Sequence, residues 1–157
     1  MNEENREENL EEGLNKFEQQ EEETEEEKEQ RLFLEGIDKV HGWLDQKRVS
    51  KKKRRDFDQA INLLAQQYGE GNLAFEEDGE IRQFLKFPFD NLKELRYKQR
   101  LTKDEVNPYL KGVNSQDEEE RVVAFICALT KQARGVINRL DTEDSQVPDA
   151  VAVFFVS

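Results

Sequence analysis

Seven positively charged side chains fall within the nine positions from Lys47 to Arg55, and they are the strongest chemical feature of the sequence. This basic cluster consists of Lys47, Arg48, Lys51, Lys52, Lys53, Arg54 and Arg55. Such side chains bind phosphates and carboxylates through charge-assisted hydrogen bonds. Three roles are open: a solvated face, attraction to an acidic segment of the same or another copy of the chain, or binding of an external anionic partner. That partner is either a nucleic acid or an acidic protein surface.

The sequence contains few of the residue patterns that catalysis or metal binding requires. It has no Walker loop, no GxGxxG motif and no GxSxG motif, and His41 is its only histidine. The EEDG stretch ending at Gly79 fails as a calcium loop, because Ala74 and Leu85 would occupy ligand positions. The single cysteine, Cys127, lies in an apolar run, so we expect it to be buried. We predict no enzyme activity, no cofactor and no metal.

Charge is distributed unevenly along the 157 residues. Residues 1–30 carry fourteen Glu against three basic residues, a net charge of −11, whereas the whole chain carries −12. This acidic arm has too little apolar surface to offset the entropy of ordering it. We predict that it is disordered and that one domain spans residues 31–157. Within the arm, Leu10, Leu14 and Phe17 share one helical face, either by chance or as a segment that folds in a partner's groove.

The sequence also predicts the cellular compartment of the protein. No stretch approaches the ~20 apolar residues of a membrane helix, and the N-terminus is acidic, without the apolar core of a signal peptide. We expect a cytoplasmic protein that does not bind membranes. The overall acidity argues against an autonomous nucleic-acid binder, because the acidic arm would compete with phosphates for the same cations.

Apolar residues recur at helical spacing through most of the body, so we predict a mostly α-helical domain. Ser50 caps one predicted helix, and Thr102 with Glu105 forms a capping box for another. Residues 69–79 are expected to form a loop or a short hairpin. The predicted helices cover residues 29–45, 51–68, 80–87 and 91–101, and the capping box at Thr102 predicts a further turn or two that extends through Leu110 to Gly112.

The most regular pattern lies between Ser115 and Leu140. A capping box at Ser115 and Glu118 precedes apolar residues spaced alternately four and three apart: Val122, Ile126, Leu129, Ala133, Val136 and Leu140. This spacing predicts one long, heptad-patterned C-terminal helix. It is either a core helix of the monomer or a coiled-coil seam for self-association. The apolar end, residues 151–157, is predicted to be a short strand, inside the domain or as an edge that recruits another chain.

The layout of an acidic arm, a helical body and Gln pairs at Gln19-Gln20 and Gln66-Gln67 resembles one known family. These are the McdB-type adaptors that space carboxysomes along the nucleoid of cyanobacteria. The resemblance covers the whole chain and concerns its organisation. It implies an adaptor that binds the shell of the carboxysome, a bacterial microcompartment, and a ParA-like positioning ATPase.

We therefore expect a non-enzymatic adaptor or assembly protein that forms a homo-oligomer and links a cargo to a protein partner. The alternative is a nucleic-acid-associated regulator that uses the basic cluster. If the acidic arm and the basic cluster attract one another, assembly beyond the first oligomer should weaken as salt rises.

Overall fold

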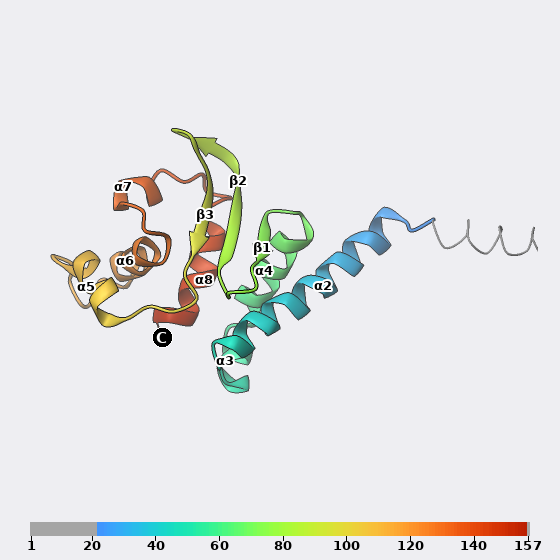
Figure 1. The fold of residues 1–157 in the computed structure, drawn as a ribbon, viewed down its shortest axis with the longest axis horizontal. Helices are drawn as coiled ribbons and strands as arrows, with labels where there is room; N and C mark the ends of the chain where they lie inside the picture. The colour runs from blue at the N-terminus through green and yellow to red at the C-terminus, as the bar shows by residue number, and fades with distance from the viewer. Residues whose placement is uncertain (1–21, 157) are drawn as a thin grey trace, which may run out of the picture. The chain divides into compact units, whose positions relative to one another are not determined.

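The computed structural model describes residues 22–156, which form a mostly helical fold with one small antiparallel sheet (Figure 1). The predicted helical class is confirmed. Contacts divide the chain into two units, Met1–Arg31 and Leu32–Ser157, and the second unit holds the sheet and the core. In chain order the elements are α2 (Glu25–Gln46), α3 (Lys51–Asp56), α4 (Asp58–Gly69), β1 (Leu73–Phe75), β2 (Ile81–Phe89), β3 (Leu92–Tyr97), α5 (Lys103–Leu110), α6 (Glu118–Thr130), α7 (Arg134–Ile137) and α8 (Gln146–Val156).

Within the first unit, α2 begins before the predicted end of the acidic arm. The Thr24 hydroxyl accepts a hydrogen bond from the Glu27 amide at 3.1 Å, and three glutamates in the first turn complement the helix dipole. Residues 25–30, predicted to be disordered, are therefore helical, because capping and dipole effects act against charge repulsion. The remaining arm residues, 1–21, lie outside the described part of the chain, and they include Leu10, Leu14 and Phe17.

Within the second unit, α2 approaches α4 so closely that the contact requires glycine. A Cβ atom added to Gly36 would lie 2.4 Å from the Ala65 carbonyl oxygen, and real Cβ atoms essentially never make so short a contact. Val40 and Leu44 continue the buried face of α2. The helix predicted over residues 29–45 is thus confirmed.

The short helices predicted over residues 80–87 and 91–101 are wrong, because β2 and β3 occupy this part of the chain. The strands are ordered β1-β2-β3 and pair antiparallel, with Ile81 opposite Tyr97. Buried and less buried residues alternate at the start of β2, the period of a half-buried strand. The Asp90-Asn91 turn has positive φ at both residues, 49° and 64°, as a two-residue hairpin turn requires. Asp and Asn tolerate this conformation, and pairing between the strands then overrides the local preference for helix.

A buried polar network ties the inner face of the sheet to the segment before α8. The Tyr97 hydroxyl donates to Gln83 Oε1 at 2.6 Å, and Gln83 Nε2 donates to the Asp144 carbonyl oxygen at 2.8 Å. The Asp144 carboxylate accepts from the amides of Lys86 and Phe87 at 2.9 and 3.0 Å. Burial, and then nearby carboxylates, raise the pKa of Tyr97 well above its ordinary value, so its hydroxyl stays a donor.

The long helix predicted over residues 115–140 is wrong, because α6 ends at Thr130. The helix is capped by Asp117, whose carboxylate accepts from the Glu120 amide at 3.2 Å. Lys131 then adopts a left-handed φ of 56°, which ends the helix, and α7 follows as a separate element. The heptad spacing therefore runs over two packed helices instead of one continuous rod.

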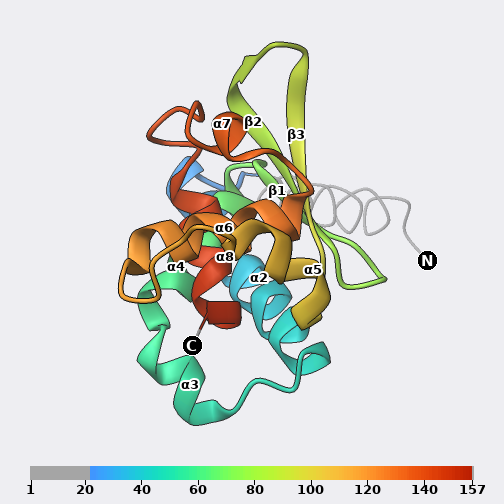
Figure 2. The same cartoon turned by 90° about the vertical axis from the view of Figure 1, so that its left-hand side faces the viewer.

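The strand predicted over residues 151–157 is also wrong, since the chain is helical to Val156. This helix, α8, packs against both α4 and α6 and lies at the centre of the helical layer (Figure 2). Val151 and Phe154 are buried, and the rings of Phe154 and Trp43 meet edge to face at 5.7 Å. β-branched and aromatic residues favour strands locally, but in α8 they pack into the core as a helix, whose polar residues Gln146 and Asp149 are exposed.

Candidate functional site

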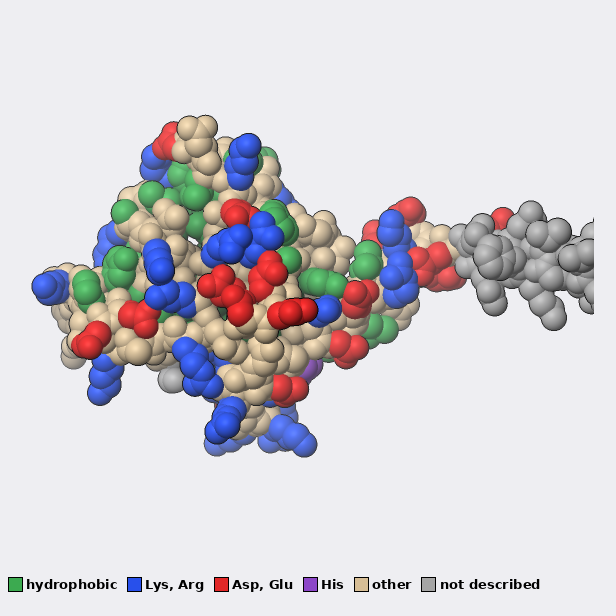
Figure 3. All heavy atoms as spheres, in the orientation of Figure 1, with side chains coloured by type: hydrophobic (Ala, Val, Ile, Leu, Met, Phe, Trp, Pro, Cys, Tyr) green, Lys and Arg blue, Asp and Glu red, His purple; other side chains and the backbone are tan. Residues whose placement is uncertain are grey.

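The basic cluster lies at the turn between α2 and α3 and along α3 itself. Ser50 caps α3 as predicted, because its hydroxyl accepts from the Lys53 amide at 3.2 Å. The single helix predicted over residues 51–68 is divided at Phe57 into α3 and α4. Figure 3 shows Lys and Arg side chains gathered at the lower end of the body, where Figure 1 places α3.

Three of the seven cations are engaged in contacts within the fold. Lys47 and Lys53 donate through Nζ to backbone carbonyl oxygens, at 2.6 and 3.5 Å. Arg54 donates through Nη2 to the Asp45 carboxylate at 2.6 Å, and only 15% of its side chain is exposed. These three side chains stabilise the α2–α3 turn and its contacts with distant segments.

Lys47 occupies a half-buried aromatic site. Its Nζ lies 3.5 Å from the centre of the Phe155 ring and 5.5 Å from that of Trp43, and it donates to the Gln99 carbonyl oxygen. These contacts favour the charged form. Burial outweighs them and, with two nearby cations, lowers the pKa of the Lys47 ammonium from 10.5 to about 8.

This pKa gives the free energy of unfolding a specific dependence on pH. Between pH 8 and 10.5 the unfolded chain binds the Lys47 proton more strongly than the folded chain does, so stability rises with pH over this window. Below pH 8 both states bind the proton and the contribution is constant. Lys47→Met is expected to abolish this rise, as measured by urea unfolding at a series of pH values. Lys39→Met, at an exposed position of α2, should retain it, and parallel curves for the native chain and Lys47→Met would contradict the assignment.

The other four cations of the basic cluster face solvent. Arg48, Lys51, Lys52 and Arg55 are exposed, and their side chains make no ion pair or hydrogen bond with any residue that the structure describes. Hydrated cations of this kind cost little to leave unpaired, and their charge remains available to an incoming anion. These four unpaired cations are the solvent-facing part of the basic cluster.

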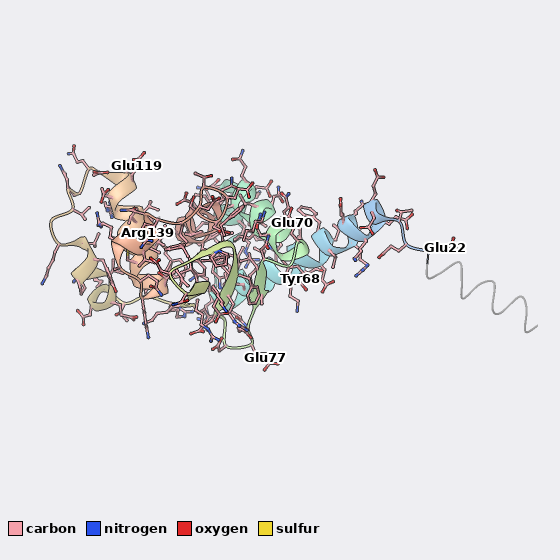
Figure 4. The ribbon with its side chains drawn as sticks, turned by 90° about the horizontal axis from the view of Figure 1, so that it is seen from above. Glu22, Tyr68, Glu70, Glu77, Glu119 and Arg139 are labelled. Carbon is pink, nitrogen blue, oxygen red and sulfur yellow. The ribbon has the colours of Figure 1, made fainter. Side chains whose placement is uncertain are left out.

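The outer face of the sheet, by contrast, pairs its own charges. Arg82 donates to Glu76 at 3.3 Å and to Glu94 at 2.7 Å. Glu77, at the β1–β2 turn, points away from the body (Figure 4). Because the Arg82 guanidinium is already bound by two carboxylates, it offers little charge to an external anion.

A pocket of about 440 Å³ opens beside the basic cluster, and it was not foreseen from the sequence. The three elements that line it are consecutive in the chain, but the break at Phe57 that turns α4 against α3 was not anticipated. The lining residues are His41 of α2, Lys51, Arg54 and Arg55 of α3, and Asp58 and Ile61 of α4.

The six heptad residues proposed for self-association do not form one exposed stripe. Ile126, Leu129 and Leu140 are buried, Val122 and Val136 are half-buried, and Ala133 is exposed. Since α6 ends before Ala133, these residues do not form a continuous coiled-coil seam. Self-association of the chain stays a prediction.

The described part of the chain offers neither a metal site nor a membrane-spanning helix. Among residues 22–156, no group of three His, Cys, Asp or Glu side chains is placed to hold a metal ion. Cys127 is buried, as predicted. No helix within that range is long and apolar enough to cross a membrane. Comparison with known protein families, with curated proteins and with solved structures finds no match to this chain.

Proposed function

We propose that this chain is a non-enzymatic adaptor whose second unit binds an acidic protein surface through Arg48, Lys51, Lys52 and Arg55. The observation that carries the proposal is the division of the basic cluster into three cations used inside the fold and four that are exposed and unpaired within residues 22–156. The engaged cations fix the backbone, so the four unpaired cations are presented at a defined place. Clustered charge of this kind steers an anionic partner and accelerates its association.

An acidic protein surface suits this footprint better than a nucleic acid does. A protein that contacts about 6–10 phosphates of duplex DNA needs more cations than four side chains on one short helix and its turn supply. The resemblance of the layout to the McdB-type adaptors extends the proposal to a ParA-like ATPase as the protein partner and the carboxysome shell as the cargo. Formation of a homo-oligomer belongs to the same proposal.

A charge-removal variant tests the binding surface. Replacing all four unpaired cations with Gln is expected to weaken binding of a fluorescein-labelled octaglutamate peptide about tenfold at low salt. Exposed ion pairs contribute about 0.2–1 kcal/mol each, and 1.4 kcal/mol corresponds to a factor of ten. Fluorescence anisotropy measures the affinity.

The matched control removes the same charge elsewhere. Four exposed lysines with no partner in the described part of the chain are replaced with Gln: Lys39, Lys93, Lys103 and Lys111. Equal weakening by the two variants would mean that net charge alone governs binding, and the proposed surface would be wrong. Tighter binding of a short DNA duplex than of octaglutamate at the same salt would favour the nucleic-acid alternative.

A further inference from the structure

The pocket beside α3 combines an apolar floor with a cationic rim. Its floor includes Ile61, which is 2% exposed, and its rim carries Lys51 and Arg55. These two cations are four residues apart on α3, so they lie on the same face of the helix. A volume of about 440 Å³ with a few convergent polar groups is typical of a small-ligand site.

The third cation of the pocket, Arg54, is held rigidly. Its Nε donates to the Val49 carbonyl oxygen at 3.1 Å, its Nη2 to Asp45 at 2.6 Å, and its Nη1 lies 3.2 Å from His41 Nδ1. A guanidinium can only donate, so His41 Nδ1 is the acceptor.

The charges of the pocket limit what it can accept. Arg54 is neutralised by Asp45, so Lys51 and Arg55 supply the attraction for an anion, and the Asp58 carboxylate opposes it from the side of α4. Because one carboxylate opposes two available cations, the net positive charge of these three side chains favours a ligand with a single anionic group.

We infer that this pocket binds one anionic oxygen group, a carboxylate or a phosphate monoester, carried on an apolar stem. Lys51 and Arg55 bind the anion, and the stem packs on Ile61. The inference deepens the proposed function and rests on it, since it assigns to the pocket the anchoring side chain of the acidic partner.

The single histidine makes the test direct. His41 is the only histidine in the chain and lines the pocket, so its imidazole proton resonances report binding without further assignment. Phenyl phosphate and 3-phenylpropionate are each expected to shift these resonances saturably, which separates the phosphate source from the carboxylate source. Inorganic phosphate, which lacks the stem, and benzyl alcohol, which lacks the anion, should shift them less at equal concentration. Equal shifts with inorganic phosphate would overturn the inference.

Two variants of equal charge separate the pocket from the wider basic cluster. Lys51→Gln/Arg55→Gln removes the rim and is expected to abolish the saturable shift, whereas Arg48→Gln/Lys52→Gln, outside the pocket lining, should retain it. Trp43 fluorescence verifies the fold of both.

The outcomes distinguish this inference from the proposed function. Two results would overturn the inferred ligand site and leave the proposed function in place. One is equal loss of the saturable His41 shift in both variants, and the other is no shift with any probe while octaglutamate still binds. Saturable aryl-anion binding without octaglutamate binding would retain the pocket and overturn the proposed function.

Discussion

Replacing Gly36 with Ala is expected to lower the free energy of unfolding by about 3 kcal/mol, because the added methyl group has no space at the α2–α4 contact. The Cβ atom would lie 2.4 Å from the carbonyl oxygen of Ala65 and 2.9 Å from its Cα. Both are backbone atoms, which cannot rotate away as a flexible side chain could. The two helices would have to separate, and the core residues between them would lose contact.

Gly42 provides the matched control on the same helix. A Cβ atom there meets nothing within 4 Å, so Gly42→Ala should raise stability by about 0.5–1 kcal/mol through helix propensity alone. Thermal unfolding followed by circular dichroism should place Gly36→Ala below the native chain, by roughly 10 °C, and Gly42→Ala above it. Similar melting temperatures for the two variants would mean that α2 and α4 do not pack as described.

Replacing Asp144 with Ala is expected to cost about 3–5 kcal/mol of stability. Its carboxylate is the acceptor for the amides of Lys86 and Phe87, and each hydrogen bond to a charged group contributes about 1.5–3 kcal/mol. Asp144 is 3% exposed, so water does not readily replace the lost acceptor. Asp144→Asn, which keeps one acceptor oxygen, should fall between Asp144→Ala and the native chain.

The control for this substitution is the neighbouring Glu143, whose side chain is exposed and makes no hydrogen bond within the described residues. Glu143→Ala should change stability by less than about 0.5 kcal/mol. Urea unfolding measures both variants, and amide hydrogen exchange should show that Lys86 and Phe87 lose protection in Asp144→Ala. An unchanged urea midpoint for Asp144→Ala would contradict the buried network.

Elements with local signals were the ones that the sequence predicted. The 29–45 helix has clear apolar periodicity, and Ser50 and the pair Thr102 and Glu105 cap helices within a few residues of their own positions. Periodicity and capping act within one or two turns, so they can be read along the chain.

Elements that depend on distant partners were not predicted. β2 and β3 contain residues of mixed propensity, and they become strands because they pair with one another and because Asp144, far along the chain, binds the β2 backbone. The heptad spacing led to a wrong prediction although it is a clear local pattern. It is regular along the chain, but the left-handed conformation of Lys131, which ends α6, leaves no mark in an apolar pattern.

The candidate site likewise has one part that the sequence predicted and one part that it did not. The basic cluster was identified from the sequence, since its charges are adjacent there. Its division into engaged and unpaired cations was not, because the acceptors of Lys47 and Lys53 lie 52 and 101 residues away along the chain. The pocket around His41 likewise required the packing of three helices.

Backbone amide chemical-shift mapping with octaglutamate tests the central claim most directly. The account predicts that the largest shifts fall on residues 48–55, which include the four unpaired cations, and that they diminish as salt rises because exposed charges are screened. It also predicts that the amide resonances around Lys93, Lys103 and Lys111, which are also exposed lysines, shift little. Shifts spread evenly over all exposed lysines, with no maximum on residues 48–55, would contradict it.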